Sequence, residues 1–360
     1  MKKALSDICY YVSDKIPVKQ VRLDDYVSTE NLLQNRGGLS VASKLPPSGK
    51  VTAFQAGDAL VSNIRPYFKK IWLADRSGGA SNDVLVFRKL NDNICEKYLY
   101  YILADDRFFA FSTASASGSK MPRGDKSQIM NYPVKLPPLE VQKKITDILS
   151  SLDEKIELNR RMNETLEQLG QALFRHYFVD KTKQSNGNIQ TIPLGKKFHL
   201  KRGRSLQARD MICGDTPVIS GGLKPAGFHN EANTTAPVIT ISASGANAGF
   251  VSVWGEPVWS ADSSYIDSTI TKYVYTYYLF LKNKQKEIYD MQTGSGQPHI
   301  YPKHIELLEI ADLSDCEFNG FEQRVRPLFD MIHENKKQID YLSNIRDLLL
   351  PKLISGEIEV

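Results

Sequence analysis

The sequence is poor in the residues that build metal sites and disulfide frameworks. Its 360 residues include only four cysteines. These cysteines are isolated, with no Cys-x-x-Cys pair and no close histidine: Cys9, Cys95, Cys213 and Cys316. A structural zinc site or a set of disulfides is therefore not expected, and this cysteine usage fits a reducing cytoplasm.

Long apolar runs are missing as well. None approaches the roughly 18 residues that a membrane-spanning helix needs, which argues against an integral membrane protein. Two lysines follow Met1 as in a signal peptide, but Ser6 and Asp7 interrupt the apolar stretch that should come next. We expect a cytoplasmic protein with no membrane partner.

The motifs of common catalytic sites are also absent. There is no GxxxxGK[ST] phosphate loop, no GxGxxG after a strand, no nucleophile elbow and no HExxH zinc motif. No Asn-Pro-Pro-aromatic string, which would hold an adenine for methylation, occurs either. The acidic cluster at Asp153 and Glu154 is interpreted as a solvated helix face rather than a nuclease site. We therefore expect no active site, no bound cofactor and no metal in this chain.

The charge is modest in total and uneven along the chain. The net charge is +5, of which residues 1–138 carry +7 while residues 314–360 carry −3. Between residues 186 and 313 the basic side chains concentrate near one end, around Lys201. Such clusters are compatible with nucleic-acid binding, but a solvated surface explains them equally well.

Two segments carry the apolar spacing of long helices. From Val141 to Leu173 apolar residues recur in steps of three and four, and Lys155 and Asn159 occupy the polar positions of this row. The row predicts a helix of about 40 residues, or about 60 Å in length. This is longer than a domain of about 130 residues is wide. We therefore expect the apolar stripe to pack on a second helix rather than on its own domain.

The second such segment starts at Val325 and runs through Asn335 to Leu349, where Pro351 is expected to end the helix. A polar residue in the middle of each row can fix the register of two paired helices. The segments before the helices contain short β-rich runs and helical stretches, as in mixed α/β domains.

The sequence thus predicts an α+β protein. Two mixed α/β domains, residues 1–138 and 186–313, are each followed by a long helix, within residues 139–185 and 314–360, and the two helices are expected to form a coiled coil. The two halves also resemble each other. KYLYYIL (97–103) matches KYVYTYYLF (272–280), GSKMPR (118–123) matches GSGQPH (294–299), and Val141-Gln142 matches Glu322-Gln323. Three matches in the same order, 175 to 181 residues apart, indicate an internal repeat that arose by duplication.

Several strings resemble one known family. VKLPPLEVQKKI (134–145) with the helical segment after it, and FEQRVRPLFDMIHENKKQIDYLSNIRDLLLPKLISGEI (321–358), resemble the two conserved regions of type I restriction–modification specificity subunits (HsdS). YVSTENLLQNRGG (26–38) is similar to a string of their target-recognition domains. The one departure is Phe318–Glu322, where FNGFE replaces the Pro-Pro-Leu entry of the first helix, so the start of the second helix is not defined by the resemblance.

The resemblance implies two domains that are held apart on two long antiparallel helices with approximate two-fold symmetry. It also implies a function without catalysis. Each target-recognition domain would read one half of a bipartite, asymmetric site on double-stranded DNA, and the helices would set the unread spacer. The chain would assemble with two modification subunits that use S-adenosylmethionine to methylate adenine. It would also assemble with two restriction subunits that use ATP and Mg. The chain itself would bind none of these cofactors.

In protein–DNA complexes, contacts to base edges determine the sequence that is recognised, and contacts to phosphates supply affinity. Basic, amide and imidazole side chains on glycine-rich loops are therefore the candidates for recognition. The candidates in the first domain are Arg65, Tyr67, Lys69, Lys70, Lys120, Arg123 and Lys126. Those in the second are Lys201, Arg202, Arg204, Gln297 and His299. The loops 118–123 and 294–299 are the strongest case, because they recur at the same place in both halves.

Two further interpretations remain open at this point. Trp72, Trp254 and Trp259 could stack on bases, but their strand-like apolar surroundings favour core packing, as they do for the tyrosines of residues 273–278. The chain as a whole could instead be a self-sufficient methyltransferase or nuclease with an unfamiliar site. It could also be a coiled-coil scaffold whose domains bind protein.

Overall fold

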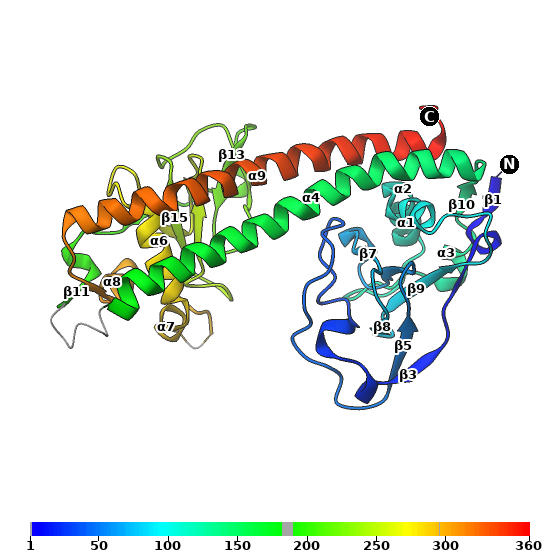
Figure 1. Ribbon diagram of the computed structural model, residues 1–360, viewed down its shortest axis with the longest axis horizontal. Coiled ribbons are helices and arrows are strands. Elements are labelled where there is room, and N and C mark those ends of the chain that lie inside the picture. Colours follow the sequence, from blue (N-terminus) through cyan, green and yellow to red (C-terminus); the bar gives the residue numbers. More distant parts are fainter. Residues whose placement is uncertain (1, 182–189, 295) are drawn as a thin grey trace. The chain divides into compact units, whose positions relative to one another are not determined.

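The chain divides into two compact units that each take part of both long helices. The computed structural model describes residues 2–181, 190–294 and 296–360. Unit 1 comprises Met1–Ile156 and Asp340–Val360, and unit 2 comprises Glu157–Ile339 (Figure 1). Residues 182–185, which the sequence assigned to the end of the first helical region, lie outside the described residues.

Unit 1 is built on two four-stranded sheets. The first has the order β2-β9-β6-β7 and the second the order β3-β5-β8-β4. The strands of the first sheet are β2 (Cys9–Tyr11), β9 (Val84–Lys89), β6 (Ala59–Ser62) and β7 (Ile71–Leu73). Those of the second are β3 (Lys15–Pro17), β5 (Lys50–Phe54), β8 (Gly78–Ala80) and β4 (Tyr26–Val27). A separate antiparallel pair joins β1 (Lys2–Ala4) to β10 (Pro133–Lys135).

Three short helices and the ends of the two long ones complete unit 1. The short helices are α1 (Glu96–Ala104), α2 (Asp106–Ala114) and α3 (Lys126–Ile129). Their apolar side chains form one core with the first sheet, with Ile145 and Leu149 from the first long helix and with Leu350 and Leu353 from the second. The long helices are therefore part of the domain core rather than a separate scaffold.

Unit 2 repeats this plan. Its four-stranded sheet has the order β12-β18-β15-β16, with β12 (Lys201–Arg202), β18 (Ser263–Asp267), β15 (Val238–Ser242) and β16 (Val251–Trp254). A three-stranded sheet contains β14 (Gly227–His229), β13 (Thr216–Ile219) and β17 (Trp259–Ser260). The pair β11 (Thr191–Pro193) and β19 (Glu309–Ala311) corresponds to β1 and β10. The short helices are α6 (Val274–Asn283), α7 (Gln285–Asp290) and α8 (Pro302–Glu306).

The first long helix, α4, spans Leu139–Phe174 and continues as a π-helical segment, Arg175–Asp180. Its buried row includes Ile145 and Asn159 of the predicted row but lies one residue further along at three other places. Ile148, Lys155 and Leu169 are exposed there, whereas Leu149, Ile156 and Gly170 are buried. The prediction was wrong at these three positions because α4 carries two adjacent apolar stripes, and periodicity alone cannot choose between them. At Gly170 a Cβ atom would come within 3.3 Å of Leu279, so glycine lets α6 approach closely.

The second long helix, α9, spans Asp315–Ser355. Its start is fixed by a capping box in which Ser314 Oγ accepts from Glu317 N and the Glu317 carboxylate accepts from Ser314 N. The expectation that Pro351 ends this helix was wrong. A proline inside a helix costs about 3 kcal/mol, but burial of Leu353 and Ile354 in the core of unit 1 keeps the last turn helical.

The asparagines of the two helical rows each form a hydrogen bond to the opposite helix in unit 2. Asn159 Nδ2 donates to Gln338 Oε1 at 2.7 Å, and Asn335 Nδ2 donates to Asn163 Oδ1 at 2.9 Å. Residue numbers rise on α4 as they fall on α9, so the helices are antiparallel there. Because a buried amide needs a partner, these two hydrogen bonds define one register.

The internal repeat extends to side-chain roles. Gln142 Oε1 accepts from the backbone of Cys95 at the start of α1, and Glu322 Oε2 accepts from the backbone of Thr276 in the first turn of α6. Glu322 is thus the counterpart of Gln142, and the sequence match of Gln142 to Gln323 was off by one residue. Burial raises the pKa of the Glu322 carboxyl.

The predicted fold class is confirmed by these observations: two mixed α/β domains, two long helices paired antiparallel and an internal repeat. The tryptophans belong to the cores as expected. Trp259 is buried, and Trp72 and Trp254 pack against apolar clusters. The tyrosines of α6 are buried too.

Candidate nucleic-acid interface

In unit 1 the loop after α2 forms a narrow hairpin. Ser117 and Arg123 exchange two backbone hydrogen bonds, of 3.0 and 2.9 Å. Gly118 has a φ of +106°, a conformation that side chains with a Cβ rarely adopt. The hairpin holds Lys120 and Arg123, both exposed, on a short turn.

This hairpin is anchored to the segment that follows β6. Arg65 N donates to Pro122 O at 2.8 Å, and Gly124 N donates to Asn63 O at 3.3 Å. The Arg65 guanidinium in turn donates to Lys120 O at 3.0 Å. Three of the predicted residues, Arg65, Lys120 and Arg123, are thereby brought together from distant parts of the sequence.

Unit 2 contains the same hairpin in the same setting. Thr293 and His299 exchange two backbone hydrogen bonds, of 2.9 and 2.8 Å. Gly245 N donates to Pro298 O at 3.0 Å, as Arg65 does to Pro122 in unit 1. Both residues have positive φ, +80° at Gly245 and +51° at Arg65. Gln297 is exposed within this hairpin, and its carbonyl oxygen lies 2.8 Å from His299 Nδ1. Ser295 lies outside the described residues.

The other candidates of unit 1 lie around the short 3-10 helix Pro66–Phe68 or beyond it. Tyr67 is half-exposed, and Lys69 Nζ donates to Asp106 at 2.8 Å. Lys70 Nζ donates to Thr29 O, and partial burial lowers its pKa. Lys126 begins α3 and is exposed. Lys70 thus has a structural partner on another loop, while Tyr67 and Lys126 remain available on the surface.

The basic residues of unit 2 lie on and after the edge strand β12. Lys201 and Arg202 pair with β18, and the Arg202 guanidinium donates to Asp262 Oδ1 at 3.0 Å. The Arg204 guanidinium lies 6.0 Å from the ring centre of Trp259. Asp262 also accepts from Ser244, whose backbone bridges to His299, so Arg202 and His299 belong to one surface.

Two residues beside the candidate surface were missed by sequence reasoning. Asp83 precedes β9 and Asp262 precedes β18, and each binds a candidate arginine. The sequence offset of the repeat could have revealed them. Ser81-Asn82-Asp83 and Ser260-Ala261-Asp262 are 179 residues apart, within the 175 to 181 residues that separate the other matches. Carboxylates were not sought because a DNA-binding surface was expected to be basic.

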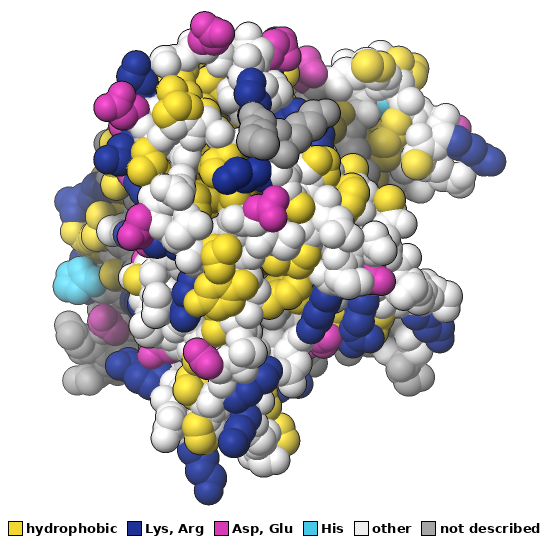
Figure 2. All heavy atoms as spheres, turned by 90° about the vertical axis from the view of Figure 1, so that its right-hand side faces the viewer, with side chains coloured by type: hydrophobic (Ala, Val, Ile, Leu, Met, Phe, Trp, Pro, Cys, Tyr) yellow, Lys and Arg dark blue, Asp and Glu magenta, His cyan; other side chains and the backbone are white. Residues whose placement is uncertain are grey.

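Basic side chains are unevenly distributed on the surface. Figure 2 shows one face of the molecule, where Lys and Arg side chains are most frequent in the lower part and Asp and Glu side chains are scattered from the top to the lower part. Clustered basic side chains raise the local positive potential, which attracts a phosphate backbone.

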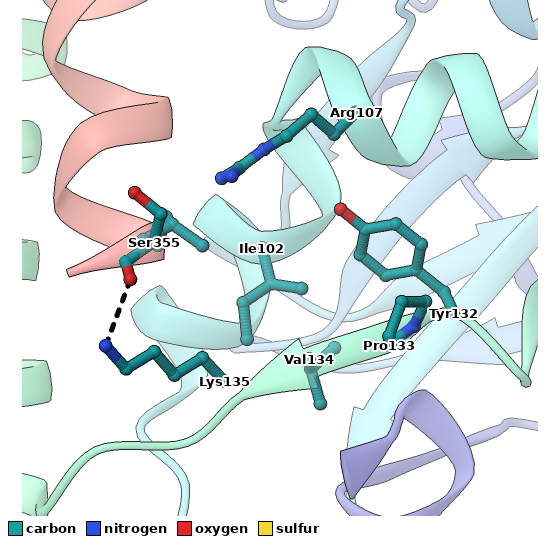
Figure 3. A pocket seen from close by; sticks show the side chains of 8 residues that line it. Ile102, Arg107, Tyr132, Pro133, Val134, Lys135 and Ser355 are labelled. Atoms are coloured by element: carbon teal, nitrogen blue, oxygen red, sulfur yellow. Dashed lines mark hydrogen bonds between the residues drawn. The ribbon is translucent and has the colours of Figure 1, made fainter. Parts of the chain in front are cut away.

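A separate pocket lies in unit 1, with a volume of about 570 Å³, and shares no residue with the hairpin. Figure 3 shows Arg107, Tyr132 and Lys135 around an opening between β10 and the end of α9. Lys135 Nζ donates to Ser355 O at 3.0 Å, which ties β10 to the last turn of the helix. This contact stabilises the terminus of α9 and involves none of the recognition candidates.

The sequence and the fold both match proteins of known class. Residues 1–168 match the family described as type I restriction modification DNA specificity domain. The HindI specificity subunit of Haemophilus influenzae is 25% identical over 99% of this chain and 98% of its own length. The MjaIX specificity subunit of Methanocaldococcus jannaschii is 24% identical over 93% of this chain and 85% of its own length. The chain thus carries a match to this DNA specificity domain in its first half and is similar over nearly its whole length to type I restriction enzyme specificity subunits.

A solved structure agrees on the fold. The S subunit of a type I restriction–modification system from M. genitalium superposes with a TM-score of 0.61 at 20% identity, covering 98% of this chain and 96% of that one. The matched family is described by DNA specificity and not by a catalytic activity. The comparisons therefore favour DNA recognition over the self-sufficient methyltransferase and the protein-binding scaffold.

Two further observations concern the described ranges only. Within residues 2–181, 190–294 and 296–360, every helix falls short of the length and apolarity of a membrane span. In the same ranges His, Cys, Asp and Glu side chains form no group of three that could hold a metal ion.

Proposed function

We propose that the hairpins 117–123 and 293–299 each read one half of a bipartite, asymmetric DNA site. The observation that carries this proposal is that the two hairpins share one geometry but not one set of side chains. Each is closed by a paired backbone bridge and anchored by a positive-φ residue, Arg65 or Gly245. The side chains differ, with the exposed Lys120 and Arg123 in one and the exposed Gln297 and the half-buried His299 in the other. A shared backbone geometry that carries different side chains fits the recognition of two different DNA sequences.

The long helices set the length of the unread spacer in this proposal. The two amide pairs of Asn159 and Asn335 favour one register over its neighbours, and a defined register is what a spacer of defined length requires. Tyr67, Lys126 and Lys201 supply phosphate contacts beside the hairpins, which add affinity but no sequence preference.

The chain further assembles with two modification subunits and two restriction subunits. An exposed stripe on the unit 2 part of α4 supports docking of a modification subunit: Leu158 is 53% and Leu169 46% exposed, and Met162 lies between them. Their spacing of four and seven residues puts them on one face of the helix. S-adenosylmethionine, ATP and Mg serve these partners rather than this chain, and the complex works in the cytoplasm.

The experiment that tests the proposal replaces Lys120 and Arg123 by Ala in one variant and Gln297 and His299 by Ala in another. Each variant is expressed with its modification partner, and methylated sites are mapped by sequencing. We expect each variant to lose base preference in one half-site and to keep the other, because a good base contact contributes about 1–3 kcal/mol of discrimination. A loss of preference in both half-sites from either variant contradicts the two-reader arrangement. An unchanged site contradicts the role of the hairpins.

A further inference from the structure

Each unit places one carboxylate beside its recognition hairpin, at the same point of the repeat. Asn63 N donates to Asp83 O at 2.8 Å, and Ala243 N donates to Asp262 O at 3.1 Å. Asn63 and Ala243 are also the residues whose carbonyl oxygens anchor the hairpins, through Gly124 N and Ile300 N. Both carboxylates are therefore fixed to the hairpin frame by backbone hydrogen bonds. Their side chains are exposed to the same extent, 38%.

The arginine that each carboxylate binds comes from a different element. Arg123, in the hairpin of unit 1, places Nε and Nη2 each 3.1 Å from Asp83 Oδ1. In unit 2 the hairpin residue matching Arg123 is His299, and Asp262 instead binds Arg202 of the edge strand β12. The two units thus share the carboxylate at this position but take its arginine from different elements. An ion pair that formed by chance on the surface would not explain why the carboxylate recurs.

The contacts leave part of each guanidinium available. Asp83 engages the Nε and Nη2 edge of Arg123, and in the described part of the chain nothing binds its Nη1. Asp262 engages Arg202 through Nη2 alone. A guanidinium with a free Nη edge matches the O6 and N7 acceptors of guanine in the major groove. A bound carboxylate also restricts the rotamers of a long side chain, which lowers the entropy lost on reading a base.

We propose that Asp83 and Asp262 are positioning residues that hold Arg123 and Arg202 for one guanine in each half-site. This inference rests on the proposed function, since it requires the hairpin surfaces to face DNA. The carboxylates also cancel much of the charge of the two arginines, so these arginines favour a base edge over phosphate.

The experiment maps methylated sites for Asp83→Asn, Asp83→Glu, Arg123→Lys and Arg123→Ala, each expressed with the modification partner. Arg123→Ala and Arg123→Lys are expected to lose one G·C preference in one half-site, because lysine cannot bind guanine O6 and N7 with a planar fork. Asp83→Asn should weaken the preference at that same base pair by roughly tenfold. Asp83→Glu keeps the negative charge and should therefore retain most of the preference at that base pair. Asp262→Asn and Arg202→Lys should act on a G·C pair of the other half-site.

The matched control is Asp75→Asn, which breaks an exposed Asp–Arg contact of 2.8 Å to Arg76, away from the hairpin. It should leave every base preference unchanged. The inference is overturned if Asp83→Asn keeps the native site, or if it relaxes a base pair that Arg123→Ala leaves intact. It is also overturned if the relaxed pair is not G·C. If Arg123→Ala and the hairpin double variants all keep the native site, the proposed function fails instead.

Discussion

Lengthening both long helices by one heptad should lengthen the unread spacer of the DNA site. The structure defines where the two insertions match. Asn159 and Gln338 are hydrogen-bonded in unit 2, so they lie at one level of the antiparallel pair. Insertions after Asn159 and immediately before Gln338 therefore extend both helices at that level, and seven residues preserve the alternation of three and four in the buried row.

The size of the effect follows from helix and duplex dimensions. Seven residues add about 10 Å at 1.5 Å per residue, which equals about three base pairs at roughly 3.4 Å each. One heptad changes the helical phase by about 20°, whereas three base pairs turn the duplex by about 100°. The mismatch in rotation reduces the gain, so we expect one to three added base pairs. The bases read at each end should stay the same, because no hairpin is altered.

The assay is sequencing of methylated sites in cells that carry the extended chain and its modification partner. A matched control inserts three residues at the same two places, which puts the apolar row out of phase and should abolish modification. An active heptad variant with the native spacer would refute the proposal that the helices set the spacing. A change in the bases recognised in either half-site would refute the proposal that the helices set only the spacer length while the hairpins select the bases.

Two further predictions concern docking and pH. Replacing Leu158 and Leu169 by Glu should weaken association with the modification subunit in co-purification, because charge replaces an exposed apolar stripe. The control, Glu in place of the exposed Gln168, should leave association unchanged. Equal binding by both variants would argue against this docking face. Burial lowers the pKa of His333 from 6.5 to about 4, with Lys336 and Lys337 adding to the shift. The unfolded chain therefore takes up a proton between pH 6.5 and 4 that the folded chain does not, and stability should fall by up to about 2 kcal/mol on going from pH 7.5 to 5. Urea unfolding at both pH values should show a smaller fall for His333→Leu, and an equal fall would contradict the assignment.

The long helices could be predicted from sequence because their signal is local. Apolar residues at steps of three and four specify a helix from its own residues. The choice of buried stripe on α4 is not local. Ile148 and Leu149 are both apolar, and Leu149 is buried because it meets the core of unit 1, to which residues from α1 and α9 contribute. The same burial keeps the turn at Pro351 helical.

The repeat and the two hairpins were also within reach of the sequence, because glycines and prolines recur at a nearly constant offset. The sequence by itself therefore determined the architecture and the place of the two candidate hairpins. Only the tertiary structure brought Arg65 to Lys120, Asp83 to Arg123 and Asp262 to Arg202. These contacts join residues 40 to 60 positions apart. They depend on strand order and on backbone hydrogen bonds between loops, which no periodicity along the chain records.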